Sequence, residues 1–160
     1  MFVDFEKLPE TSKIWIYQSD RKFYPNELEG LKNKLEGFLS SWNDNGNDII
    51  SSYQFKYDRF IIFAVDETID AITVNAIDDS VRFILQLQSD YEVELLDKLN
   101  VCFKQGKFVQ YKEVKEFKKL IKSKSISAKT IVFNNLINTK AELASDWEIP
   151  ITESWHNRFL

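Results

Sequence analysis

Residues 60–65, Phe-Ile-Ile-Phe-Ala-Val, form the longest uninterrupted apolar run of the chain. A half-buried strand alternates apolar with polar residues, so a run without a polar residue predicts a central strand covered on both faces. The run is far too short to span a bilayer, and we expect no membrane insertion. Because 160 residues can bury a sizeable core around such a strand, we predict a single globular domain over residues 1–160.

The other segments alternate between strand and helix patterns. Residues 14–17 are β-branched and aromatic and predict a strand, whereas leucines and aromatics recur at helical spacing from Leu28 to Trp42. Further strands are expected at 53–57, 101–104, 107–111 and 130–136, further helices after Asp78 or Asp79, at 114–121 and at 140–147, and a loop at 43–48. The order β-α-β-β-α-β-β-α-β-α predicts an α+β fold with helices packed on a single-layer, mainly antiparallel sheet.

The scarcity of reactive residues excludes several kinds of chemistry. The chain has one histidine (His156), one cysteine (Cys102) and four glycines, and it contains neither a P-loop nor a dinucleotide-binding glycine motif. No cofactor is therefore predicted. A lone cysteine forms no internal disulfide, which favours a reducing, cytoplasmic location. Cys102 is expected to be a buried structural thiol, and His156 a polar surface residue or a partner for a carbonyl group, although a Cys102–His156 dyad is the catalytic alternative.

An acidic group follows the apolar run and consists of Asp66, Glu67, Asp70, Asp78 and Asp79. Carboxylates at a strand end suit Mg²⁺, as in phosphoryl-transfer enzymes. The simpler interpretation is that Asp66 and Glu67 enter solvent while Asp78 or Asp79 caps a helix.

A basic segment occupies residues 104–124, which carry eight lysines and two glutamates. Aromatic rings interleave with the lysines, a combination that suits single-stranded nucleic acid because cations neutralise phosphates and rings stack on bases. The candidate surface consists of Lys104, Lys107, Phe108, Tyr111, Lys112 and Lys115. The alternative is that these lysines only solvate one face of a helix.

Large rings also gather near the C-terminus, at Trp147, Trp155 and Phe159. Because large rings are costly to leave in water, we expect them to dock onto the sheet. If they are exposed, they mark a contact patch for a partner or a second copy.

Several segments resemble those of an uncharacterised family of cytoplasmic proteins of about this length from Bacteroidetes. They are KIWIYQSDR (13–21), RFIIFAVD (59–66), IDDSV (77–81), FNNL (133–136), TKAE (139–142) and the stretch from Ser154 to Phe159. Members of the family often carry the label "ABC transporter ATPase". The absence of a Walker A motif in this chain does not support that activity.

Polar residues of these segments stand at the ends of predicted elements and form a candidate pocket. They are Arg21, Arg59, Asp66, Asp78, Asn134, Asn135 and Lys140. If the strand ends share one edge, Arg21 and Lys140 would meet an anionic ligand that the asparagines orient. The alternative is that the arginines pair with nearby carboxylates and the asparagines form a bulge or a turn.

Taken together, the residues favour a non-enzymatic cytoplasmic protein that acts as a protein-interaction or assembly domain. Its partner would be another protein or a second copy of the chain. Single-stranded nucleic-acid binding through 104–124 is one alternative. A small-ligand or metal-dependent enzyme built on the carboxylates of 66–79 is the other, and the sequence leaves it open.

Overall fold

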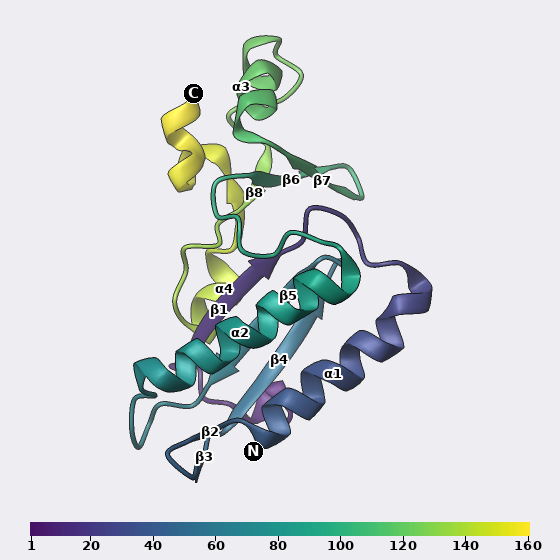
Figure 1. The fold of residues 1–160 in the computed structure, drawn as a ribbon. Helices are drawn as coiled ribbons and strands as arrows, with labels where there is room; N and C mark the ends of the chain where they lie inside the picture. Colours follow the sequence, from purple (N-terminus) through teal and green to yellow (C-terminus); the bar gives the residue numbers. More distant parts are fainter. The chain divides into compact units, whose positions relative to one another are not determined.

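A computed structural model describes residues 1–160, which divide into two compact units. Unit 1 comprises Met1–Leu96 and Asn138–Ala141, and unit 2 comprises Asp97–Ile137 and Glu142–Leu160. Helices and mostly antiparallel strands occur in the chain, which confirms the predicted α+β class (Figure 1). The strands form three separate sheets rather than the single sheet expected from the sequence.

The main sheet of unit 1 has the order β1-β5-β4 and is antiparallel throughout. Its strands are β1 (Lys13–Gln18), β4 (Ser51–Lys56) and β5 (Phe60–Val65). All six residues of β5 are fully buried, as the continuous apolar run predicts for a central strand. Residues 138–141 run beside β1, where Asn138 O accepts from Ile14 N at 2.9 Å.

Two long helices, α1 (Leu28–Ser41) and α2 (Val74–Tyr91), cover one face of this sheet (Figure 1). In α1, Leu31, Leu35 and Leu39 recur every fourth residue and are fully buried, so this stripe faces the sheet. The core joins the strands and both helices through Tyr17, Leu31, Leu35, Leu39, Trp42, Ile61, Phe63, Val65, Ile84 and Leu87. Phe63 lies at its centre, within 6.4 Å of the rings of Tyr17, Phe38, Trp42 and Phe83.

The predicted loop at 43–48 is a small hairpin of β2 (Asn43–Asp44) and β3 (Asn47–Asp48). Asn45 and Gly46 between them have φ values of 53° and 85°. A two-residue type I′ turn requires positive φ at both central positions, and Asn-Gly is its preferred sequence. The expectation of a loop was wrong because the flanking residues are polar and show no strand alternation.

The start of α2 also differs from the prediction. Thr73 is the N-cap, and its Oγ1 accepts from Ala76 N at 3.3 Å. Asp78 and Asp79 therefore lie inside the helix as exposed residues and cap nothing.

Unit 2 is built on a four-stranded antiparallel sheet with the order β7-β6-β8-β9. The strands are β6 (Val101–Gln105), β7 (Phe108–Lys112), β8 (Ile131–Phe133) and β9 (Glu148–Pro150). Its helices are α3 (Val114–Lys122) and the part of α4 (Lys140–Ser145) that follows Ala141, and the chain ends in 3₁₀ turns at Ile151–Glu153 and Trp155–Phe159.

The core of unit 2 is smaller and gathers around Phe117 of α3. It contains Val101, Phe103, Phe117, Ile126, Val132 and Ile151, with Leu120, Ile121 and Phe159 packed against it. No helix of either unit is long and apolar enough to cross a lipid bilayer.

Candidate functional site

The predicted polar pocket does not form as expected, because two of its members occupy opposite ends of one strand. Arg59 precedes β5 and Asp66 follows it. At about 3.3 Å per residue, their Cα atoms lie more than about 20 Å apart. Arg59 is buried and donates from Nη1 to Ser19 O at 3.0 Å, whereas its Nε has no partner.

Two other cations of the expected pocket are engaged within unit 1. Arg21 donates from Nη1 to Glu27 Oε1 at 2.9 Å, and this bond raises the pKa of Arg21 and lowers that of Glu27. Lys140 Nζ donates to Phe5 O at 3.0 Å and to Leu8 O at 2.8 Å. The Arg21–Glu27 pair matches the ion-pair alternative, whereas Lys140 stabilises local backbone through carbonyl groups.

The carboxylates expected to bind metal do not converge. No group of three histidine, cysteine, aspartate or glutamate side chains in the chain is arranged to hold a metal ion. Asp66 Oδ1 instead accepts from Thr68 N at 2.9 Å and from the Thr68 hydroxyl. Glu67 Oε2 accepts from Ile72 N at 2.9 Å. The acidic residues thus shape the loop before α2.

The Cys102–His156 dyad is absent because the two side chains belong to different surroundings. His156 packs against Phe117, which contacts Phe103 on one face of β6, whereas Cys102 points to the opposite face. The expectation that His156 lies on the surface was wrong, since it is only 1% exposed. Its Nδ1 lies 2.6 Å from the Ser154 hydroxyl, and burial lowers the pKa of His156 to about 4.

The six residues of the predicted basic surface do not share one face. In the β6–β7 hairpin, Phe108 and Lys112 lie on the face of Phe103, and Lys104 and Tyr111 lie on the other. Lys104 also forms an ion pair with Glu148. Lys107 lies in the turn between the strands, and Lys115 is exposed on α3. The hairpin therefore separates Lys104 and Tyr111 from Phe108 and Lys112.

The C-terminal rings pack into unit 2 to different extents. Trp147 is 2% exposed, lies 5.0 Å from the Phe133 ring and donates from Nε1 to Asn135 Oδ1 at 2.9 Å. Trp155 and Phe159 are half-buried. Their rings lie 5.7 Å apart, and Phe159 lies 6.1 Å from Phe117. These rings hold the C-terminal turns in place and leave no fully exposed aromatic patch among the three.

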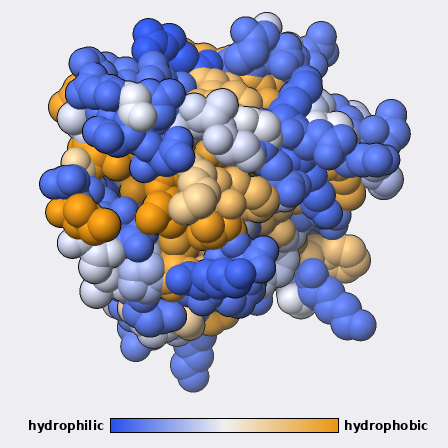
Figure 2. Space-filling model, turned by 90° about the horizontal axis from the view of Figure 1, so that it is seen from below, coloured by the Kyte–Doolittle hydropathy of each residue, from blue (hydrophilic) through white to orange (hydrophobic).

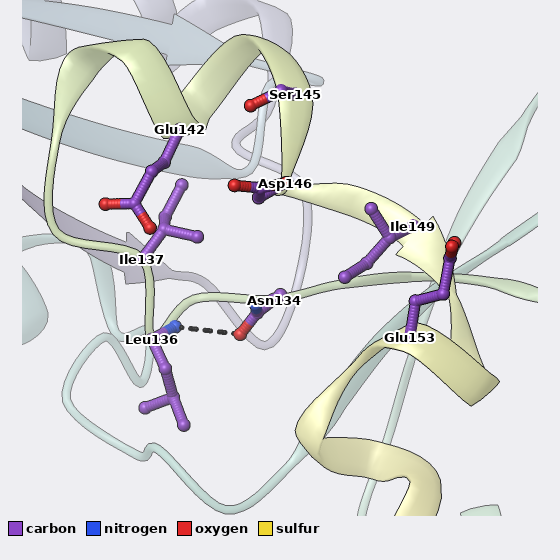
Figure 3. A pocket seen from close by; sticks show the side chains of 8 residues that line it. All are labelled: Asn134, Leu136, Ile137, Glu142, Ser145, Asp146, Ile149 and Glu153. Carbon is purple, nitrogen blue, oxygen red and sulfur yellow. Dashed lines mark hydrogen bonds between the residues drawn. The ribbon is translucent and has the colours of Figure 1, made fainter.

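Unit 2 contains a pocket of about 290 Å³ beside α4, which includes the predicted residue Asn134 (Figure 3). Its lining is Asn134, Leu136, Ile137, Glu142, Ser145, Asp146, Ile149 and Glu153. Asn134 Oδ1 already accepts from Leu136 N at 3.3 Å, and Glu142 reaches from α4 toward Ile137. The pocket brings the carboxylates of Glu142, Asp146 and Glu153 together with the apolar side chains of Leu136, Ile137 and Ile149.

A larger hollow of about 540 Å³ lies in unit 1, between the β2–β3 hairpin and the loop before α2. We call it the acid-rimmed hollow. Its lining is Asp44, Asn45, Asn47, Asp48, Ile49, Ile50, Asp66, Ile69, Asp70, Ala71, Ile72 and Thr73. Four aspartates and no lysine, arginine or histidine are present, so the hollow has negative charge without an internal counter-ion.

Two of the four aspartates hold the hollow together and two are unengaged. Asp44 accepts from Thr73 N at 2.8 Å and from Thr73 Oγ1 at 2.7 Å, which ties the hairpin to the first turn of α2. Asp66 bonds to Thr68 as described above. Asp48 and Asp70 are exposed and have no partner. They are therefore available to a cation from outside the chain.

Exposed apolar side chains flank the acid-rimmed hollow. Ile69 is 87% exposed and Val74 is 71% exposed. Figure 2 shows the side of the molecule on which β2, β3 and the N-terminus lie in Figure 1, and apolar atoms gather there within a mainly hydrophilic surface. The sequence prediction missed this site. The sequence feature that could have indicated it is Ile69, an isolated apolar residue among acidic neighbours that fits neither a strand nor a helix period.

Comparisons with protein-family models, curated proteins and solved structures match nothing to this chain. The resemblance to the Bacteroidetes family therefore stays a prediction.

Proposed function

We propose that this protein acts without catalysis, by binding a partner protein through the acid-rimmed hollow of unit 1. The observation that carries the proposal is Ile69, a large apolar side chain 87% exposed at the rim of a preformed hollow. Exposed apolar surface with a polar rim is characteristic of interaction sites. The single cysteine supports a cytoplasmic setting for this interaction.

The chemistry of the hollow specifies the kind of segment that fits it. Ile50, Ile69 and Ile72 offer contacts to an apolar side chain. Asp48 and Asp70 offer unpaired carboxylates beside them. A partner segment with an apolar side chain flanked by lysine or arginine would cover the isoleucines with the apolar side chain and pair its cations with the two aspartates. The charges would mainly speed association, and the apolar contacts would slow dissociation.

The test compares two double variants that each replace two exposed apolar side chains by serine. Ile69→Ser with Val74→Ser alters the hollow, whereas Leu85→Ser with Leu99→Ser alters exposed leucines elsewhere and serves as the control. Each pair should change stability by no more than about 1 kcal/mol, because all four residues are exposed and a single surface substitution usually costs at most about 0.5 kcal/mol. Chemical crosslinking in nuclease-treated lysate, read by mass spectrometry, identifies partners, and sedimentation velocity reports self-association.

We expect the wild type and the leucine control to recover the same partner, and the hollow variant to lose it at least tenfold. Asp70→Asn should weaken the same complex by slowing association, and added salt should reproduce that effect. A partner retained by the hollow variant would contradict the proposal. So would a wild-type chain that is monomeric and recovers no partner.

A further inference from the structure

All four lysines of α3 lie along one face of the helix. Lys115, Lys118, Lys119 and Lys122 are spaced i, i+3, i+4 and i+7, and all are exposed. We call this row the lysine face. From Lys115 to Lys122 it extends about 10 Å at 1.5 Å per residue.

The opposite face of α3 is already occupied. Phe117 is fully buried, with its ring 5.7 Å from that of Phe103, and Leu120 and Ile121 pack against the same core. A membrane-binding amphipathic helix must bury its apolar face in lipid. Because the apolar face of α3 forms the core of unit 2, only its charged face is available to a ligand.

The lysine face keeps most of its charge unpaired. Lys119 is the only one of the four with a carboxylate within 4 Å, and its 3.4 Å contact with Glu116 is exposed and therefore weak. Lys118 lies 5.4 Å from the Phe159 ring centroid, which leaves its ammonium charge intact. Lys112, just before α3, has no carboxylate partner either. Such a surface suits a partner with closely spaced negative charges.

An exposed aromatic ring stands on the same side of unit 2. Phe108, at the tip of the β6–β7 hairpin, is 65% exposed. It shares a strand face with Lys112 and Phe103, which is the face on which α3 packs. An exposed ring on the same side of the unit as unpaired lysines can stack on a base while the lysines contact phosphates.

We propose that the lysine face and Phe108 bind single-stranded nucleic acid, with the lysines on the phosphates and the ring on a base. This differs from the surface expected from sequence, because Lys104 and Tyr111 lie on the other face of the hairpin and Lys118, Lys119 and Lys122 are added. The exposed ring favours a single strand over a duplex, whose bases are already stacked.

The test measures fluorescence anisotropy of labelled 20-nucleotide single-stranded RNA and DNA with the full chain. Four lysine contacts predict a slope of about −2.8 for log affinity against log salt, or about a 50-fold loss from 50 to 200 mM KCl. Changing Lys115, Lys118, Lys119 and Lys122 to Gln should remove most of this slope. Phe108→Ser should weaken single-strand binding roughly fivefold or more and leave binding to a duplex of equal length nearly unchanged.

A matched control changes four exposed lysines of unit 1, Lys7, Lys22, Lys32 and Lys56, to Gln. It alters net charge equally, so retained binding by this variant assigns the effect to the lysine face. No binding by the wild type at 50 mM KCl, or equal losses in the two quadruple variants, would overturn the proposal. Salt-sensitive self-association abolished both by the lysine-face change and by Asp48→Asn with Asp70→Asn would also overturn it, since the lysines would then contact a second copy.

Discussion

Unit 1 and unit 2 differ in both core and charge. Unit 1 covers its sheet with helices of 14 and 18 residues, whereas unit 2 relies on a nine-residue helix and short 3₁₀ turns. Unit 1 has ten lysines and arginines against eighteen aspartates and glutamates, a net charge of −8. Unit 2 has eleven against seven, a net charge of +4. The whole-chain charge of −4 conceals this separation, because unit 1 carries an excess of negative charge and unit 2 an excess of positive charge.

The largest expected effect comes from removing the central ring of each core. Phe63→Ala and Phe117→Ala each empty a fully buried site and should cost about 3–5 kcal/mol. If the units unfold separately, Phe63→Ala raises amide exchange in peptides of unit 1, and Phe117→Ala raises it in peptides of unit 2. Hydrogen exchange read by mass spectrometry distinguishes the units.

If residues 1–160 instead form the single domain predicted from the sequence, the exchange measurement should give a different result. In that case either variant would raise exchange in both units together, because one cooperative block has one free energy of unfolding. Ile62→Val, a smaller change in the same strand as Phe63, serves as a control, with an expected cost of about 0.5–1.5 kcal/mol.

Local patterns allowed most of the elements to be predicted. The β5 run was recognised because continuous apolar sequence has few alternatives to a covered strand, and α1 because its leucines keep one helical period. The predicted start of α2 was wrong because Asp78 and Asp79 are also good cap residues. The observed cap, Thr73, is held by hydrogen bonds to Asp44, which is 29 residues earlier in the chain. The residues next to Thr73 in the sequence therefore do not indicate that it caps the helix.

The candidate sites were harder to predict because they depend on distant pairings. The acid-rimmed hollow joins residues 44–50 to residues 66–73. The basic surface was placed in the right segment, but its members could be sorted by face only after the β6–β7 register was known. Likewise, the burial of His156 follows from contacts with Phe117, 39 positions away, that its neighbours do not indicate.

The second prediction uses the only histidine, which belongs to unit 2. The pKa of His156 is about 4 in the folded chain, whereas an unfolded histidine titrates near 6.5. Between these values the unfolded state binds the additional proton, so stability falls as pH falls. The loss should be about 1.4 kcal/mol per pH unit, about 3 kcal/mol in all, and complete below pH 4.

Exchange measured from pH 7 to pH 4, corrected for the intrinsic rate, checks whether unit 2 carries this loss. His156→Phe keeps a ring between Trp155 and Phe117 but cannot titrate, so its unit 2 should lack that part of the pH dependence. An NMR titration of the single imidazole gives the pKa directly. A value near 6.5 in the folded protein would contradict the prediction.

The smallest effects compare the hairpin turns of the two units. Gly46 has φ of 85° and Gly106 has φ of 62°, and an added Cβ meets no atom within 4 Å at either position. Alanine should therefore cost only the left-handed backbone strain, about 1 kcal/mol, whereas asparagine, which tolerates this region, should cost less. The consequences should differ, because Asp44 connects the unit 1 hairpin to the Thr73 cap. Gly46→Ala should raise amide exchange in the first turn of α2 as well as in the hairpin, while the effect of Gly106→Ala should stay within β6 and β7. Equal and strictly local effects would show that the Asp44–Thr73 bonds do not couple the hairpin to the helix.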